Sequence, residues 1–402
     1  MARFSGQAVI PTTFFFRYLL PSLFTHRYAW RMMSSQVRKY LMPLNPEKDV
    51  PVGMVSLRAN EVCNLRCASC GQWGENGHLL RKLQRGERLN ELSFDVVKRI
   101  IHETARDKPF YYIWGGEPTM WKPLVPVFEE MAEVGVYGLI ATNAHELGRV
   151  IEELMDTGAL AALNLSVDGW DAASQNQLRS PAGGRVSDNF ERTMAVIHKI
   201  EELKKRKRSR FPLVNPITVV SNRNYSRLVD IHRLVMDTTQ IHSYYYGWFI
   251  TEERARLHEQ VFRDLFGYEP RNHRGYLKSC FNDVDPKVTA AQLREVVRMS
   301  RGRACVPQFF PHFVDEQRVR RYYEDHAWDC GYPVCRSIYY TAEISPDGRL
   351  TPCRDYQDFT AGNVNEDSFY GIWNGEKFKR FRRKLSTGLM PVCTRCCGLQ
   401  GL

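Results

Sequence analysis

The first 46 residues contain no aspartate or glutamate, although the whole chain has 45 acidic residues and a formal net charge of +11. The positive charges of this segment are therefore uncompensated, and aromatic residues accompany them. A basic and aromatic segment predicts either contact with a membrane surface or an anionic partner, or an extension that wraps on the folded domain. Its basic residues, which supply six of the eleven excess charges, are Arg3, Arg17, Arg27, Arg31, Arg38 and Lys39.

Long apolar runs are also missing from this segment. Prolines and arginines interrupt it before any run reaches the roughly 18 residues that a transmembrane helix needs. No compact hydrophobic region leads to a small-residue cleavage site, so a secretory signal peptide is not predicted. The eleven cysteines, an odd number, then argue against a disulfide framework and for thiolate ligands in a reducing compartment. We expect a cytoplasmic protein, with peripheral membrane contact through residues 1–46 as the alternative.

Strand-like runs alternate with amphipathic helical windows from about residue 51. With 43% hydrophobic and 12% aromatic residues over 402 positions, the chain can form one large domain and a smaller one. Such alternation favours parallel βα units, and we expect a partial (β/α)6 barrel of the TIM type with its sites at the carboxyl ends of the strands. The expected strands are Met54–Arg58, Phe110–Trp114, Val136–Thr142, Ala161–Val167, Leu213–Val220 and Ser243–Ile250. The expected helices are Phe94–Ala105, Leu124–Ala132, Glu146–Met155, Phe190–Leu203, Arg227–Met236, Glu252–Phe266, Ala290–Met299 and Phe369–Leu385.

The regular alternation stops after residue 251. The next 79 residues hold helical windows, many charges and proline-containing connections, and we expect a helical insertion or bridge there, not a seventh βα unit. A cysteine-rich region follows, with an expected hairpin formed by Ile338–Ile344 and Arg349–Thr351. The predicted organisation is an extension (1–50), a barrel (51–251), a bridge (252–330) and a small C-terminal α+β domain (331–402).

Three cysteines at a C-x3-C-x2-C spacing follow the first expected strand: Cys63, Cys67 and Cys70. Three thiolates on one tight loop can bind three irons of a cubane cluster and leave the fourth iron open to a further ligand. Buried inert thiols are the alternative. The tight spacing and the position at the end of a strand favour the cluster.

The Cys63–Cys70 stretch resembles the cluster motif of the radical S-adenosylmethionine (radical SAM) superfamily. The resemblance covers about residues 50–250. It implies a [4Fe–4S] cluster whose open iron chelates the methionine group of SAM. It also implies one-electron cleavage of SAM to a 5′-deoxyadenosyl radical, which removes a hydrogen atom from a substrate, and an electron donor such as flavodoxin or ferredoxin.

Further motifs of this family follow the expected strands. The stretch Trp114-Gly-Gly-Glu-Pro118 resembles the family's GGEP motif, whose glycines allow close backbone approach to a ligand and whose carbonyls and glutamate can accept hydrogen bonds from the methionine ammonium. A Thr-Asn pair ends the third strand, and a Ser-Val-Asp-Gly sequence ends the fourth. The resemblance implies that SAM is bound by Gly115, Gly116, Glu117, Pro118, Asn143, Ser166 and Asp168.

One position departs from the family pattern. The residue before the third cysteine is often aromatic in this superfamily and packs near the adenine, whereas here it is Ser69. We expect Trp73 or the pair Val219–Val220 to cover the adenine instead.

The C-terminal cysteines resemble the twitch domain, the shortened form of the SPASM auxiliary-cluster domain. The resemblance implies a second [4Fe–4S] cluster, and a structural zinc site is the alternative for four cysteines. The chain lacks the additional C-x5-C-x3-C run of a full SPASM domain, so we expect one auxiliary cluster. Nearby Cys330 or Cys397 is a candidate to replace one ligand. The four expected ligands are Cys335, Cys353, Cys393 and Cys396.

An auxiliary cluster can accept an electron from a substrate radical, which converts hydrogen abstraction into a two-electron oxidation. The cysteine spacing is similar to that of the family member 2-deoxy-scyllo-inosamine dehydrogenase, so we expect oxidation of a small, sugar-like or lipid-linked metabolite. One alternative is a peptide-modifying radical SAM maturase, although no leader-binding winged helix is evident before the first strand. Another is a cluster- or zinc-bearing binding protein without SAM chemistry, which the intact Gly115–Pro118 motif disfavours. The basic run Lys204–Arg208 is interpreted as the end of a helix, so no nucleic-acid partner is expected.

Overall fold

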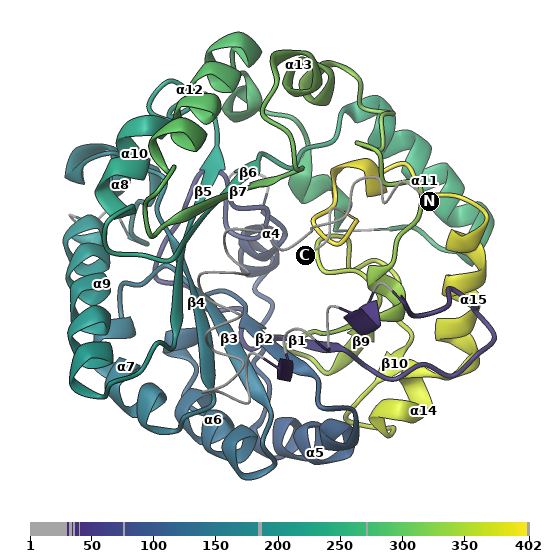
Figure 1. The fold of residues 1–402 in the computed structure, drawn as a ribbon. Helices are drawn as coiled ribbons and strands as arrows, with labels where there is room; N and C mark the ends of the chain where they lie inside the picture. The colour runs from purple at the N-terminus through teal and green to yellow at the C-terminus, as the bar shows by residue number, and fades with distance from the viewer. Residues whose placement is uncertain are drawn as a thin grey trace.

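Ten strands form one sheet in the computed structural model, which describes residues 30, 31, 34, 37–39, 41–74, 77–183, 187–270 and 272–399. The strand order is β10-β9-β8-β1-β2-β3-β4-β5-β6-β7, and all pairings from β8 through β7 are parallel. The sheet curves around an interior, with α4 at the centre of the view and the other helices around the outside, so the fold is a partial barrel (Figure 1). The strands are β1 (Met54–Arg58), β2 (Phe110–Trp114), β3 (Tyr137–Thr142), β4 (Leu160–Ser166), β5 (Leu213–Val220), β6 (Ile241–Tyr246), β7 (Val306–Phe310), β8 (Thr341–Ile344), β9 (Arg349–Thr351) and β10 (Gly362–Asn363).

The helices begin where the sequence supplies caps. The side chains of Ser93, Thr251 and Asp285 each accept a hydrogen bond from a backbone N–H in the first turn of α5, α11 and α12. Gly267 ends α11 in the left-handed conformation, at φ 85°. The helices are α4 (His78–Gln84), α5 (Phe94–Thr104), α6 (Leu124–Glu133), α7 (Leu147–Asp156), α8 (Ala172–Leu178), α9 (Asn189–Arg206), α10 (Leu228–Val235), α11 (Glu252–Phe266), α12 (Pro286–Met299), α13 (Glu316–Glu324), α14 (Phe369–Trp373) and α15 (Glu376–Ser386).

The central strands are buried on both faces, as parallel strands covered by helices are expected to be. All six residues of β6 are buried, and so are six of the eight in β5. Most of the buried apolar residues form one cluster that extends from Val50 to Leu399, and Phe110 and Ala161 form a small separate one. The barrel and the C-terminal domain therefore share a core.

The predicted strands are confirmed, and the predicted bounds of β1, β2 and β5 match the observed ones. The bridge prediction for residues 252–330 was wrong in one respect, because Val306–Phe310 form β7 and pair in parallel with β6. Pro307 made this stretch resemble a connection, but proline is tolerated in a strand at the edge of a sheet. The predicted hairpin is formed by β8 and β9, and β8 also pairs with β1, so the C-terminal domain continues the barrel's own sheet.

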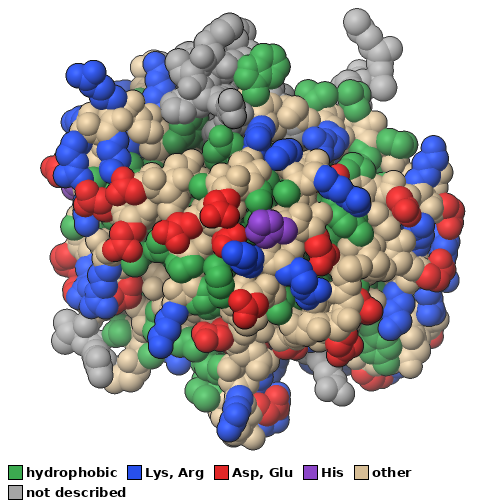
Figure 2. Space-filling model, turned by 90° about the horizontal axis from the view of Figure 1, so that it is seen from below, with side chains coloured by type: hydrophobic (Ala, Val, Ile, Leu, Met, Phe, Trp, Pro, Cys, Tyr) green, Lys and Arg blue, Asp and Glu red, His purple; other side chains and the backbone are tan. Residues whose placement is uncertain are grey.

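The basic run that ends α9 is paired with the neighbouring helix. Arg206 forms an ion pair with Glu152 and Lys207 forms one with Asp156, both in α7. Figure 2 shows acidic and basic side chains interspersed over the face seen from below. Lys204, Lys205 and Arg206 lie in the last turn of α9, as the interpretation of the run as a helix end predicts.

The predicted membrane contact of residues 1–46 lies mostly outside the described residues. Of those described, the Arg31 guanidinium lies 5.3 Å from the ring centroid of Tyr137, and Arg38 donates a hydrogen bond to the Asp107 carbonyl at 2.9 Å. Lys39 is buried. These residues therefore pack on the barrel. Within the part of the chain that the structure describes, no helix is both long enough and apolar enough to cross a membrane.

Candidate active site

The loop after β1 and the turn after β2 lie in direct backbone contact. The Gly116 N–H donates to the Asn60 carbonyl at 2.8 Å, and a Cβ on Gly116 would lie 2.1 Å from the Val62 carbonyl oxygen. Only glycine fits there, because the two loops leave no space for a side chain. The loop and the turn line one end of a cavity of about 760 Å³, to which they contribute Cys63, Cys67, Cys70, Gly115, Gly116 and Glu117.

The carboxylate of Glu117 joins this turn to the end of β3. It is 1% exposed, and it accepts hydrogen bonds from the Thr142 hydroxyl at 2.5 Å and from the Asn143 N–H at 2.8 Å. Thr119 donates both its N–H and its hydroxyl to the same carboxylate. Burial raises the pKa of Glu117, and these donors oppose the rise. Both oxygens of the Glu117 carboxylate already accept hydrogen bonds, so the predicted contact with a SAM ammonium would have to share them. Pro118 is buried at the start of the short helix that follows.

Asn143 contacts the cysteine loop from the end of β3. Its Nδ2 lies 3.9 Å from Cys63 Sγ and donates to Asn64 Oδ1 at 2.8 Å. A donor beside a thiolate stabilises its charge and influences the metal that it binds. The structure therefore places this predicted residue next to an expected iron ligand.

Arg179 holds a similar position beside the second cysteine. One of its terminal nitrogens lies 3.7 Å from Cys67 Sγ, and the other pairs with Asp168 at 2.6 Å. Asp168 also accepts a hydrogen bond from the Val219 N–H at 2.8 Å. Asp168 is not among the residues that line the cavity. The predicted residue thus positions an arginine, which the sequence motifs did not identify as part of this site.

The cysteine sulfurs and the polar side chains beside them fit an iron–sulfur cluster with a polar ligand next to it. Burial raises the pKa of Cys63 far above its usual range and that of Cys67 to about 11, where Arg179 opposes the rise. A buried thiolate therefore needs a cationic partner, and a metal cluster supplies one. The buried atoms Gln72 Oε1 and Arg179 Nε have no hydrogen-bond partner among the described residues, although both side chains line the cavity.

Ser69 and Ser166 both line the cavity, as does Val219. Trp73 and Val220, the other residues expected near the adenine, are buried and do not line it. Val219 is therefore the expected adenine neighbour that the structure places on the cavity wall.

The four predicted auxiliary cysteines line a second, smaller cavity beside β8 and β9: Cys335, Cys353, Cys393 and Cys396. Burial raises the pKa of Cys393 to about 12. Tetrahedral zinc would hold its sulfur ligands about 3.8 Å apart. No three cysteine sulfurs in the described part of the chain lie within 4.8 Å of one another. The wider spacing favours a cluster over the zinc alternative.

The two spare cysteines lie outside the small cavity. Cys397 lines the large cavity, and Cys330 lines neither, with its sulfur 3.9 Å from the Trp328 carbonyl. The small cavity is thus lined by the four cysteines that the spacing predicted.

The large and small cavities share a wall. Arg354, the residue after Cys353, lines both of them. Cys396 lines the small cavity, and the next residue, Cys397, lines the large one. Arg354 is held by Glu343 at 2.9 Å. A molecule in the large cavity is therefore separated from the auxiliary site by adjacent residues of the same loops.

Lys39 lies at the other end of the large cavity from the cysteine loop. The Lys39 Nζ is 5.4 Å from the ring centroid of Tyr340. The Tyr340 carbonyl accepts hydrogen bonds from the backbone at the start of β1, whereas the cysteine loop follows the end of β1. Burial lowers the pKa of Lys39 to about 8. The sequence did not predict this position, because the residue belongs to a segment with no motif.

Aromatic side chains line much of the large cavity. They suit an organic substrate with flat or apolar surfaces. They are Tyr112, Trp114, Tyr245, Trp248, Tyr276, Phe281, Phe309, Phe310, Phe313 and Tyr340.

Two family models match the segments that carry the two cysteine sets. The family model described as the radical SAM superfamily matches residues 59–235, and that of SPASM, an iron–sulfur cluster-binding domain, matches residues 335–397. The chain is 26% identical over 327 residues to the AdoMet-dependent heme synthase of Methanosarcina barkeri, covering 80% of this chain and 82% of that protein. It is 28% identical over 356 residues to the PqqA peptide cyclase of Rhodopseudomonas palustris, covering 85% of this chain and 78% of that protein.

The fold has counterparts among solved structures. Streptococcus suis SuiB bound to S-adenosylmethionine is 15% identical and superimposes with a TM-score of 0.56, over 92% of this chain and 76% of that one. This likeness shows a shared fold.

Proposed function

We propose, on the premise that this chain is a radical SAM enzyme with a C-terminal SPASM domain, that it oxidises an organic substrate held in the aromatic part of the large cavity. When bound at the cysteine loop and the small cavity, the two [4Fe–4S] clusters and SAM supply a 5′-deoxyadenosyl radical and an acceptor for one further electron. The shared wall of Arg354 and Cys397 carries the proposal, because it separates the substrate cavity from the acceptor by adjacent residues only.

An oxidation also needs supported cluster ligands, a protected substrate radical and a proton acceptor, and residues of the chain can supply each of them. Asn143 and Arg179 contact the sulfurs of Cys63 and Cys67, and the aromatic lining reduces the contact of a reactive substrate radical with water. For an alcohol substrate, the carbon loses a hydrogen atom and one electron, and the hydroxyl loses a proton, which gives a carbonyl. Lys39 is the proposed proton acceptor, because its lowered pKa leaves an appreciable share of neutral amine near neutral pH.

The substrate that we favour is a small metabolite with an aromatic or apolar body, as the aromatic lining suggests. A peptide substrate is the second candidate, because five of the relatives are PqqA peptide cyclases. A flavodoxin or ferredoxin is the proposed source of the first electron, and a lipid-linked metabolite is a variant of the first candidate.

The test follows the transfer of hydrogen from the substrate to 5′-deoxyadenosine, the product of SAM cleavage. The anaerobically reconstituted enzyme is incubated with SAM, a reductant and metabolites from cells grown in deuterated water, separated into small-molecule, peptide and lipid fractions. Deuterium in 5′-deoxyadenosine, measured by mass spectrometry, identifies the fraction that holds the substrate. The proposal predicts transfer from the small-molecule or lipid fraction that survives protease treatment of that fraction. Transfer from the peptide fraction alone, abolished by protease, would establish the second candidate instead.

A further inference from the structure

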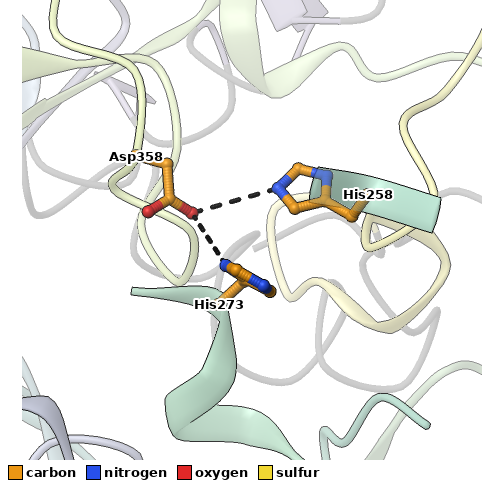
Figure 3. Close-up of side chains that lie close together, drawn as sticks. All are labelled: His258, His273 and Asp358. Atoms are coloured by element: carbon orange, nitrogen blue, oxygen red, sulfur yellow. Dashed lines mark ion pairs between the residues drawn. The ribbon is translucent and has the colours of Figure 1, made fainter. Parts of the chain in front are cut away.

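Two histidines and an aspartate face one another in the interior between α11 and the loop after β9. His258 lies on α11, His273 begins the short helix His273–Tyr276, and Asp358 lies in the loop that carries the auxiliary ligand Cys353. Figure 3 shows both imidazoles directed at the carboxylate. The side chains of all three are 1% exposed. None of them lines the large or the small cavity.

The distances within this cluster are too long for hydrogen bonds. The Asp358 Oδ2 lies 3.9 Å from His258 Nε2 and 3.9 Å from His273 Nδ1. Neither ring nitrogen of His258 has a hydrogen-bond partner among the described residues, and neither does Nδ1 of His273. Buried imidazole nitrogens are normally paired, so these three nitrogens point to a partner of another kind.

The surroundings of His273 match those of a metal ligand. Its Nε2 lies 2.9 Å from Glu259 Oε1, and since a carboxylate only accepts, this nitrogen donates and leaves the Nδ1 lone pair directed at the cluster. Glu259 is in turn held by Arg274 at 2.8 Å. Histidines that bind metals usually donate their other N–H to a carboxylate in this way.

We propose that His258, His273 and Asp358 bind a divalent transition-metal ion, with zinc as the ion to test. Two imidazoles and a carboxylate are ligands that zinc accepts, and a water completes a tetrahedral site. Such a site places its ligand atoms about 3.4 Å apart, so the observed separations close by a few tenths of an ångström on binding. The ion fastens α11 to the loop that carries Cys353, and it takes no part in SAM chemistry.

The experiment measures zinc in the enzyme whose clusters are already built. Reconstituted protein is incubated with zinc sulfate and desalted, and zinc and iron are counted by mass spectrometry. We expect about one zinc per chain and an unchanged iron content. X-ray absorption at the zinc edge should show nitrogen and oxygen neighbours at about 2.0–2.2 Å and no sulfur.

Variants assign the zinc to these residues. His258→Gln and Asp358→Asn should lose the zinc and keep the iron, and Glu259→Gln should weaken zinc binding by about 10- to 100-fold. His102→Gln is the matched control, because His102 also contacts a buried carboxylate, that of Glu130, but has an exposed side chain on α5. Wild-type protein that retains no zinc, or zinc with sulfur neighbours, or zinc that is unaffected by His258→Gln would overturn the proposal. The wild-type measurements decide the matter even where a variant does not fold.

Discussion

The cysteine loop after β1 and the auxiliary site differ in how they are assembled. The loop takes its three cysteines from eight consecutive residues, and all three are partly exposed to the large cavity. The auxiliary site draws its four cysteines from three segments of the chain, and Cys335, Cys393 and Cys396 are buried. A loop with three thiolates leaves one iron of its cluster open to a bound molecule, whereas four thiolates can ligate every iron of a cluster that then serves to exchange electrons.

The largest expected effect separates the two sites. Cys67→Ala removes an iron ligand of the open site and should reduce SAM cleavage to the background rate. Cys393→Ser should leave SAM cleavage in place and remove the oxidised product, because only the electron acceptor is lost. Both are measured as 5′-deoxyadenosine and product formed under anaerobic conditions by mass spectrometry. Equal loss of SAM cleavage in both variants would show that the sites do not have separate roles.

Arg179 distinguishes the open site further, since it contacts the Cys67 sulfur and is paired with buried Asp168. Arg179→Met should lower SAM cleavage by about 10- to 100-fold, the usual effect of removing a side chain that supports a metal ligand. The reduction potential of that cluster should also shift. Arg192→Met, which breaks an exposed ion pair with Asp188, is the control. An unchanged potential in Arg179→Met would mean that this arginine has no influence on the cluster.

A change of Lys39 tests the end of the large cavity that lies opposite the cysteine loop. Burial lowers its folded-state pKa to about 8, so the neutral amine gains share as pH rises through that value. Product formation under saturating substrate should therefore rise with pH up to about 8 and then level off. Lys39→Met should remove this limb and leave uncoupled SAM cleavage unaffected. A pH profile that is the same in both proteins would exclude the lysine as the proton acceptor.

The smallest expected effect concerns the support of the Gly115–Pro118 turn. Thr142→Val removes the hydroxyl that donates to Glu117. The loss should lower the free energy of unfolding by about 1–3 kcal/mol, because it leaves a buried carboxylate with one donor fewer. Urea unfolding of the cluster-free protein measures it, with Thr157→Val at the end of α7 as the control. A loss as small as that of the control would show that Glu117 does not depend on this bond.

Local signals account for what the sequence predicted well. The strands of the barrel follow from apolar runs and the Cys63–Cys70 set from close spacing along the chain. The set of Cys335, Cys353, Cys393 and Cys396 was implied by the resemblance to the twitch domain, and the structure brings these four to one cavity. Long-range contacts account for what it missed. The parallel pairing of β8 with β1, the approach of Arg179 to Cys67 and the burial of Lys39 each join residues far apart in the chain. Pairing across such separations is determined by tertiary packing and leaves no periodic pattern in the sequence.

The central claim is that the chain binds two clusters and that only the one at the cysteine loop is open to SAM. Electron paramagnetic resonance of the reduced protein, with and without SAM, tests it most directly in the Cys63→Ala/Cys67→Ala/Cys70→Ala variant. This account predicts about four irons per chain and a signal that SAM does not change, while the Cys393→Ser/Cys396→Ser variant keeps a signal that SAM shifts. A SAM-sensitive signal in the triple variant, or zinc in place of iron at its remaining cysteines, would contradict it.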